Sequence, residues 1–219
     1  MSDNIHIKLP DGSSKELPKG STALDVAKSI SPRLADAAIA AKISSNGDHA
    51  GEGARPTQAN STLIDLTRPL EKDTDLRILT EKDPEALGVY RHSSAHLLAA
   101  AVLELFPETK LGHGPATENG FFYDFYRETP FTPEDLEKIE KKMQELVQQN
   151  LPYAREFLPR DEGLQRFKSE GDFMKCHFIE QFTKPDEKIS IYKTGKFLDF
   201  CRGPHIPSTG KIKAFKLLN

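Results

Sequence analysis

Cysteine is scarce in this sequence, with only Cys176 and Cys201 among 219 residues. Two cysteines cannot build the disulfide framework of a small secreted protein, so a reducing compartment is expected. The first ten residues, MSDNIHIKLP, lack the basic segment and the apolar stretch of a secretory signal. No run approaches 18 apolar residues, so no membrane-spanning helix is predicted. These absences predict a cytoplasmic protein with no membrane partner.

The composition is that of a folded chain, with 37% hydrophobic and 29% charged residues. A length of 219 residues suits one large domain or two smaller ones. The net charge is −3, but residues 151–219 carry 13 Lys and Arg against 9 Asp and Glu. A basic C-terminal region is compatible with phosphate contact, and it is equally compatible with an ordinary solvated surface.

The first part of the chain shows the pattern of a small β-rich module. Alternating residues at 5–9 and the turn signal Pro10-Asp11-Gly12 predict a strand and a turn, with a second strand near 14–17. A helix is expected after the cap candidates Ser21 and Thr22, ending before Pro32. Further strands are predicted at 39–43, 63–67 and 75–79, and an exposed, mobile loop at 44–61. This order predicts a ubiquitin-like β-grasp module over residues 1–81.

The pattern changes at Asp83-Pro84, where a long helix is predicted over 84–106, ending at Pro107. A second amphipathic helix is predicted from Thr132-Pro133 to about Asn150. Strands are predicted at 121–126, 188–193 and 196–200. We therefore expect a larger α+β domain over residues 82–219, with the long helix packed on an antiparallel sheet.

Two pairs of possible ligands share the same four-residue spacing. His92 and His96 would lie one turn apart on one face of the long helix, and Cys201 and His205 flank a Gly-Pro turn in CRGPH. A zinc-protease motif would need Glu after the first His, where this sequence has Ser93. Each pair alone is as easily a structural accident. Together they offer three imidazoles and a thiol, a set able to bind zinc.

These blocks carry a resemblance to a known family. HSSAHLLAAAVLELFP, GPATENGFFYDF, LDFCRGPH and PSTGKIKAFKL resemble the amino-terminal half of bacterial threonyl-tRNA synthetases, in the same order and spacing. The preceding module is similar to the family's TGS module, and its helix start LDVAK fits as well. The HxxxH and CxxxH pairs are shared with the editing domain of the alanyl enzymes, whereas CRGPHIP is specific to the threonyl family.

The resemblance implies that residues 82–219 form an editing domain that hydrolyses the ester of Ser-tRNA(Thr) and spares Thr-tRNA(Thr). A pocket discriminates a single methyl group by only about 1–3 kcal/mol, so a synthetase for threonine requires a second sieve against serine. Carried over to this sequence, the catalytic set is His92, His96, Lys175, Cys201 and His205. The resemblance also assigns substrate binding to Asp199, Tyr123, Gly114 and Pro115.

The expected roles follow from ester chemistry. His92 is expected to contact the terminal ribose and position the attacking water, and Lys175 to hold a second water or stabilise the oxyanion. Asp199 is expected to bind the seryl ammonium group. The residues alone leave a satisfied strand carboxylate and a solvated lysine as alternatives. We expect no zinc in this site, because the ammonium group of Lys175 disfavours a dication.

Ligation is not expected of this chain by itself. It contains neither the signatures of a class II catalytic core nor a Gly-rich Walker loop, so ATP, magnesium and a further zinc are expected only in that missing core. tRNA(Thr) is the expected partner, with a monomeric fragment of an enzyme that is a homodimer at full length. A stand-alone editing protein, a non-catalytic tRNA- or partner-binding module and a structural zinc domain remain alternatives.

Two features depart from the family pattern. His113 stands where the family usually has an aliphatic residue; it either reaches the pocket mouth or simply occupies a surface position, and we expect the surface position. The 44–61 segment is longer than is usual in the first module, with no expected consequence for catalysis.

Overall fold

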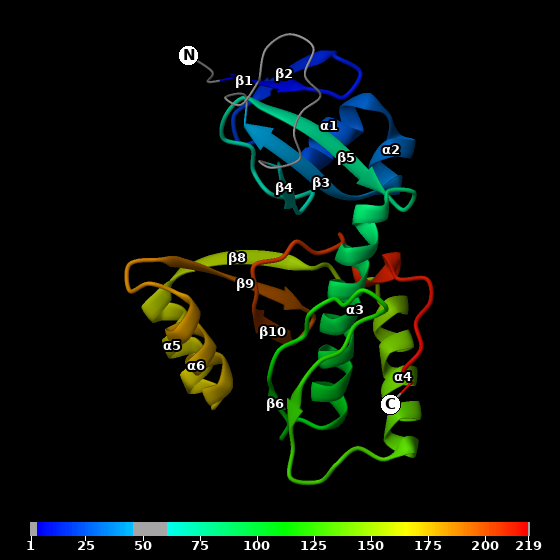
Figure 1. Cartoon of the computed structure of the whole chain (residues 1–219), viewed down its shortest axis with the longest axis vertical. Coiled ribbons are helices and arrows are strands. Elements are labelled where there is room, and N and C mark those ends of the chain that lie inside the picture. The colour runs from blue at the N-terminus through cyan, green and yellow to red at the C-terminus, as the bar shows by residue number, and fades with distance from the viewer. Residues whose placement is uncertain (1–3, 46–60, 219) are drawn as a thin grey trace. The chain divides into compact units, whose positions relative to one another are not determined.

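The computed structural model describes residues 4–45 and 61–218, which form two compact units (Figure 1). The first unit extends to Val89 and includes Pro204–Pro207, and the second holds Tyr90–Gly203 and the residues from Ser208 onward. The division therefore falls inside the long helix α3 (Pro84–Leu105). The domain ranges 1–81 and 82–219 stay a prediction.

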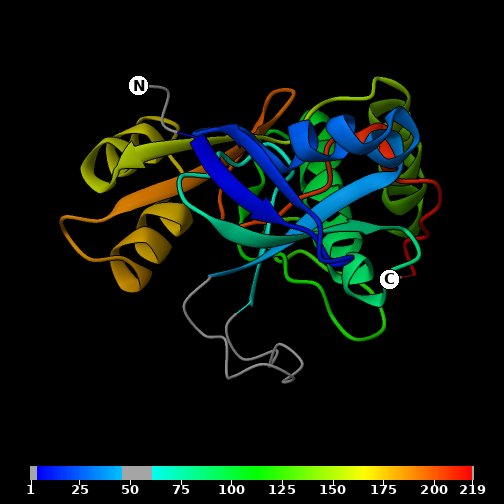
Figure 2. The ribbon, with the colours of Figure 1, turned by 90° about the horizontal axis from the view of Figure 1, so that it is seen from above.

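The first unit is a ubiquitin-like β-grasp, as predicted. Its mixed sheet has the strand order β2-β1-β5-β3-β4, in which β1 and β5 are parallel and the other neighbours are antiparallel. The strands are β1 (Asn4–Lys8), β2 (Ser14–Pro18), β3 (Ala38–Ser45), β4 (Ser61–Ile64) and β5 (Thr74–Thr80). The helices α1 (Ala23–Ile30) and α2 (Pro32–Ala37) lie on one side of this sheet (Figure 2). Alternating residues of β1, such as Ile5 and Ile7, are buried in the core.

Helix α1 begins where the sequence predicted, at a capping box in which Thr22 accepts from the backbone N–H of Asp25 and the Asp25 carboxylate accepts in return. Helix α1 ends at Ile30, before Pro32, as predicted, and the residue before the proline is in extended backbone. Ser31 ends α1 and also caps α2, and Pro32 occupies the first turn of α2, where its missing N–H costs nothing. Strand β4 ends at Ile64, three residues earlier than predicted. The predicted loop at 44–61 lies almost wholly outside the described residues.

The second unit combines helices with two antiparallel sheets. The larger sheet has the order β10-β9-β8, formed by β8 (Ala154–Pro159), β9 (Lys188–Thr194) and β10 (Phe197–Phe200). The remaining elements are the pair β6 (Lys110–Leu111) and β7 (Phe125–Tyr126), the helices α4 (Pro133–Gln148), α5 (Arg160–Ser169) and α6 (Phe173–Phe182), and the short turn η2 (Thr209–Lys211). Helices α5 and α6 pack on the sheet through Phe167, Ile179 and Ile189 (Figure 1). The α+β class and both predicted long helices are confirmed.

The strand predicted at 121–126 is largely wrong, since only Phe125 and Tyr126 pair with β6. The segment instead closes tightly around one aromatic ring. A Cβ atom at Gly114 would lie 2.1 Å from the Tyr123 ring, so the two positions pack closer than a strand pair allows. This packing directs Tyr123 into the protein, where 6% of its surface is exposed.

None of the helices within 4–45 and 61–218 has both the length and the apolar character that a membrane span requires.

Gly203, in the CRGPH segment after β10, has a backbone φ of +68°. A Cβ atom there would lie 2.0 Å from the hydroxyl of Tyr192, which is fully buried on β9 and has no room to move. Backbone conformation and contact therefore both require glycine at this position.

We expect Gly203→Ala to lower the free energy of unfolding by about 1–3 kcal/mol more than Gly171→Ala, as measured by urea denaturation. Gly171 has a similar φ of +69°, but a Cβ atom there would meet only Lys110 Nζ, at 3.7 Å. The control therefore carries the backbone strain without the clash. Equal losses for the two variants would show that Tyr192 does not constrain the CRGPH turn.

Candidate functional site

Helix α3 and the segment after β10 bring the two ligand motifs together. His92 and His96 lie one turn apart, with ring centroids 4.9 Å apart in an edge-on arrangement. His96 is buried and His92 is half-buried. The distance between His92 Nε2 and Cys201 Sγ is 3.1 Å, which is hydrogen-bonding distance. The thiol and one imidazole therefore act as a pair on one wall of the site.

Cys201 is fixed by the strand beside it. Its backbone N–H donates to the carbonyl of Ser190 at 3.2 Å, and the Ser190 hydroxyl donates to the Cys201 carbonyl at 2.6 Å. The Gly203 N–H also donates to Cys201 Sγ at 3.2 Å. The tight turn of CRGPH thus orients the thiol sulfur as well as reversing the chain.

Lys175 supplies a buried positive charge with only 3% of its surface exposed. It lies in the first turn of α6, where the side chain of Asp172 caps the helix by accepting from the Lys175 backbone N–H. Its ammonium group donates to the Gly112 carbonyl at 2.8 Å and to the Tyr123 hydroxyl at 3.0 Å, and lies 2.5 Å from Asp199 Oδ1. Two hydrogen bonds and one ion pair therefore offset the cost of removing the charge from water.

Asp199, on β10, joins the lysine to an aromatic ring. The Tyr123 hydroxyl donates to Asp199 Oδ2 at 2.6 Å. Burial, followed by the negative charge of Asp199, raises the pKa of Tyr123 well above its usual value. The phenol therefore stays protonated near neutral pH and donates to the carboxylate.

His96 completes the buried group as a neutral ring. Its Nε2 lies 3.5 Å from Asp199 Oδ2, and its ring meets Phe197 edge-on at 5.4 Å. Burial lowers the pKa of His96 well below its usual value, and electrostatic interaction with His92 and Lys175 lowers it further. His96 is therefore a hydrogen-bonding partner near neutral pH and not a cation.

These side chains line a single cavity of about 510 Å³ within the second unit. Six of the predicted residues line it: His92, His96, Gly114, Lys175, Asp199 and Cys201. Its other lining residues are His113, Phe178, Phe182, Phe200, Arg202 and Gly203. A concave site with a few converging polar groups is the usual form of a small-ligand site.

Three predicted residues have other positions. Tyr123 lies behind the lining and reaches the site through its hydroxyl, and Pro115 is half-buried outside the lining. His205 is buried among the residues of the first unit, where its backbone N–H donates to Asp65 Oδ1 at 2.8 Å. His113 does lie at the cavity and is exposed, which favours the pocket-mouth alternative for this residue.

The donor set is compatible with a metal ion. Within the second unit, one ligand atom each from His92, His96 and Cys201 lies within 4.8 Å of the other two, whereas His205, the fourth predicted ligand, belongs to the first unit. Imidazole and thiolate ligands suit zinc. The positive charge of Lys175 acts against this, because it already lowers the pKa of His96 and would equally repel a dication. The geometry therefore permits zinc, and the electrostatics oppose it.

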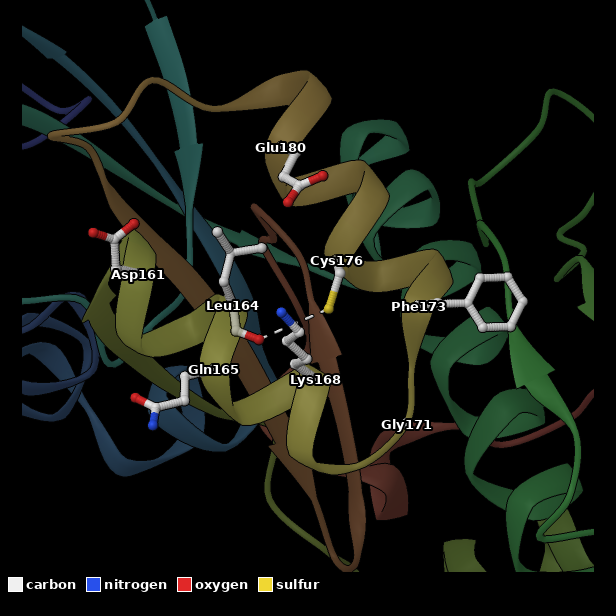
Figure 3. A pocket seen from close by; sticks show the side chains of 8 residues that line it. All are labelled: Asp161, Leu164, Gln165, Lys168, Gly171, Phe173, Cys176 and Glu180. Carbon is white, nitrogen blue, oxygen red and sulfur yellow. Dashed lines mark hydrogen bonds between the residues drawn. The ribbon is translucent and has the colours of Figure 1, made fainter.

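A second cavity, of about 470 Å³, lies between α5 and α6 (Figure 3). Its lining includes Leu164, Phe173 and Cys176, and Cys176 Sγ lies 3.7 Å from the Leu164 carbonyl. Burial raises the pKa of the Cys176 thiol, so the reactive thiolate is scarce near neutral pH. This cavity holds no activated group, and the chemistry is assigned to the first one.

The sequence analysis missed several contributors to the site, among them the Gly112 carbonyl, Phe178 and Phe182. The Gly112 carbonyl is a backbone group, which residue type does not reveal. Phe178 and Phe182 stand in α6 at intervals of three and four residues after Lys175, and this spacing was a signal that they share its face.

Comparison with known proteins gives two domain matches. Residues 5–80 match the TGS domain, and residues 189–219 match the threonyl and alanyl tRNA synthetase second additional domain. The second match includes Asp199, Cys201 and His205, whereas His92, His96 and Lys175 precede it. The matched domains support a tRNA synthetase or editing role.

Three relatives that match the chain along almost its whole length are threonine–tRNA ligases. The chain is 56% identical to a threonine–tRNA ligase of Acidobacterium capsulatum over 236 residues, covering 100% of the chain and 35% of the relative. It is 45% identical to the threonine–tRNA ligases of Hyphomonas neptunium, over 98% of the chain and 30% of the relative, and of Anoxybacillus flavithermus, over 100% and 31%. The chain thus spans about a third of the length of these curated relatives. The chain therefore contains a TGS domain and part of the threonyl and alanyl tRNA synthetase second additional domain, and along its whole length it is similar to about a third of the length of bacterial threonine–tRNA ligases.

Proposed function

We propose that this chain proofreads tRNA by hydrolysing the ester of Ser-tRNA(Thr) while sparing Thr-tRNA(Thr). The observation that carries the proposal is the buried ammonium of Lys175, ion-paired to Asp199 on the wall of the cavity that His92, His96 and Cys201 also line. A non-catalytic binding module has no need of such a charged group, which is costly to bury. Perturbed, buried titratable groups in a cavity are typical of catalytic sites.

In the proposed reaction, water attacks the ester carbonyl to give a tetrahedral oxyanion. Collapse of this intermediate releases serine and leaves a free hydroxyl on the terminal ribose. His92, half-buried at the cavity wall, positions the water through a ring nitrogen. The neutral state of His96 leaves that buried ring as a hydrogen-bonding partner of the network rather than a second positive charge.

Lys175 acts on the oxyanion mainly through its charge. Its ammonium group already donates to Gly112 and Tyr123 and is ion-paired to Asp199, so the existing contacts of Lys175 hold it in place. A fixed positive charge in a poorly hydrated cavity stabilises developing negative charge without a new hydrogen bond.

Asp199 receives the ammonium group of the seryl ester in this mechanism. Its two oxygens engage Lys175 and Tyr123, but a carboxylate offers about four lone-pair positions and can accept a further donor. The discrimination is steric, because threonine differs from serine by a methyl group that the hydrolytic pocket has to exclude.

The wider activity rests on the longer relatives. A whole protein of this family is proposed to ligate threonine to tRNA(Thr) with ATP and magnesium, using the two thirds of the sequence that this chain does not span. We propose tRNA(Thr) as the partner of the present chain, through its aminoacylated 3′ end. A monomeric state for the chain and a dimeric state for the longer enzyme stay predictions.

The proposal is tested by incubating the purified chain with Ser-tRNA(Thr) and, in parallel, Thr-tRNA(Thr). We expect the seryl ester to be hydrolysed at least about tenfold faster than the threonyl ester, because a pocket that excludes one methyl group discriminates between the two substrates by about this factor. The measurement is the fraction of radiolabelled amino acid that remains acid-precipitable. Equal rates for the two esters, or no rate above buffer, would contradict the proposal.

The roles of Lys175 and Asp199 are separated by a double-mutant cycle. Lys175→Met and Asp199→Asn should each abolish deacylation and lower the free energy of unfolding by about 3–5 kcal/mol, because each leaves one buried charge unpaired. The double variant should recover much of that stability and none of the activity. Circular dichroism in urea and the deacylation assay measure the two effects. Activity in the stable double variant would show that the pair serves the fold alone.

Zinc content tests the electrostatic argument. We expect the wild-type chain to contain substoichiometric zinc by elemental analysis, and Lys175→Met to bind zinc more tightly, because the repelling charge is gone. Cys201→Ser in the Lys175→Met background should reverse the gain. Stoichiometric zinc in the wild-type chain would overturn the expectation and favour a zinc domain.

A further inference from the structure

The cavity has more room than the reacting ester requires. Its volume of about 510 Å³ falls in the range of sites that enclose drug-sized molecules, whereas a seryl group is far smaller. The groups that serve the ester, among them Lys175, Asp199 and His92, account for part of the lining only. The remainder is aromatic and basic, and the proposed function does not yet use it.

Two aromatic rings form this remaining wall. Phe178 and Phe182 lie on α6 with ring centroids 6.2 Å apart and an angle of 29° between their planes, a stacked pair. Phe178 is half-buried, and Phe182 is 57% exposed although it lines the cavity. An exposed ring backed by a second ring offers an open face to a flat ligand.

Helix α6 sets the distance between this pair and the chemistry. Lys175, Phe178 and Phe182 follow at intervals of three and four residues, so they lie along one face of the helix. Seven residues of helix advance about 10 Å along the axis. The distance between an ester held near Lys175 and the aromatic wall is therefore similar to the length of the nucleoside that carries the ester.

Arg202 fixes the end of this helix. Its guanidinium Nη2 donates to the Phe182 carbonyl at 3.2 Å, a favourable position for a cation at a helix C-terminus. Because Arg202 follows Cys201 directly, the contact ties the aromatic ring to the segment that carries the thiol. Arg202 is also exposed at the cavity, where it adds positive charge beside the open ring.

We propose that the base of the 3′-terminal nucleotide of the aminoacylated tRNA stacks on the ring of Phe182, which is itself stacked on Phe178. This inference rests on the proposed function and names the part of its substrate that the cavity holds beyond the ester. Single-stranded RNA ends are bound by stacking of unpaired bases on exposed aromatic rings, beside arginine and lysine. Phe182 and Arg202 supply that combination at the rim of the proposed site.

The kinetic test compares two exposed phenylalanines of the same helix. Phe182→Ala should raise KM for Ser-tRNA(Thr) by about tenfold or more, and Phe182→Trp should retain the wild-type value, because stacking needs only an aromatic face. The control is Phe173→Ala: Phe173 is 58% exposed at the other end of α6 and lines the separate cavity of Figure 3.

A binding test keeps this inference separate from the proposed function. tRNA(Thr) carrying 2-aminopurine as its uncharged terminal base should lose fluorescence on binding the wild type and Phe173→Ala, and much less with Phe182→Ala. If the wild type hydrolyses Ser-tRNA(Thr) and Phe182→Ala keeps the wild-type KM, the proposed stacking on Phe182 is wrong while the editing function stands. If the wild type hydrolyses nothing, the editing function is wrong, and the stacking proposal is then decided by whether the 2-aminopurine fluorescence is quenched by the wild type and not by Phe182→Ala.

Discussion

The ion pair between Lys175 and Asp199 is the contact on which the rest of the site depends. It joins the first turn of α6 to β10, and it collects the Tyr123 hydroxyl and the Gly112 carbonyl around one buried charge. Such a pair stabilises a fold little by comparison with apolar packing, and it is costly to break from one side. Its presence beside a cavity is therefore better explained by chemistry than by stability. Helix α6 and strand β10 have to be positioned accurately, because the loss of any acceptor leaves part of the buried charge without a partner.

The same pair contributes to the ionisation of its surroundings. Burial lowers the pKa of His96 well below its usual value, and repulsion from Lys175 adds to this effect. Burial likewise raises the pKa of Tyr123, and the negative charge of Asp199 raises it further, so the phenol stays protonated. Donors and acceptors thus keep one protonation pattern over the neutral range. The argument against zinc has the same origin, since a dication would disturb that balance most.

Local signals explain what the sequence predicted well. The capping boxes at Thr22 and Thr132, and the spacing of His92 and His96, depend on neighbouring residues only. Long-range packing was not predictable: FFYDFY has the alternation of a strand, yet the close fit of Gly114 on the Tyr123 ring prevails over it. The backbone acceptor at Gly112 leaves no trace in residue type. The family resemblance supplied Lys175 and Asp199, whose charges give no sign in the sequence that they are buried.

Helix α6 fixes the position of the buried charge relative to the aromatic wall. It is held on the sheet through Ile179, which is fully buried with Phe167 and Ile189, so its position does not depend on the cavity being filled. The helix carries the ammonium group near its first turn and the stacked phenylalanines near its last. Because a helix is rigid over ten residues, the separation of charge and aromatic wall is set by the fold before any substrate arrives. Preorganisation of this kind lowers the cost of orienting an ester relative to its base, which is the difficulty that a hydrolytic site for a flexible RNA end has to overcome.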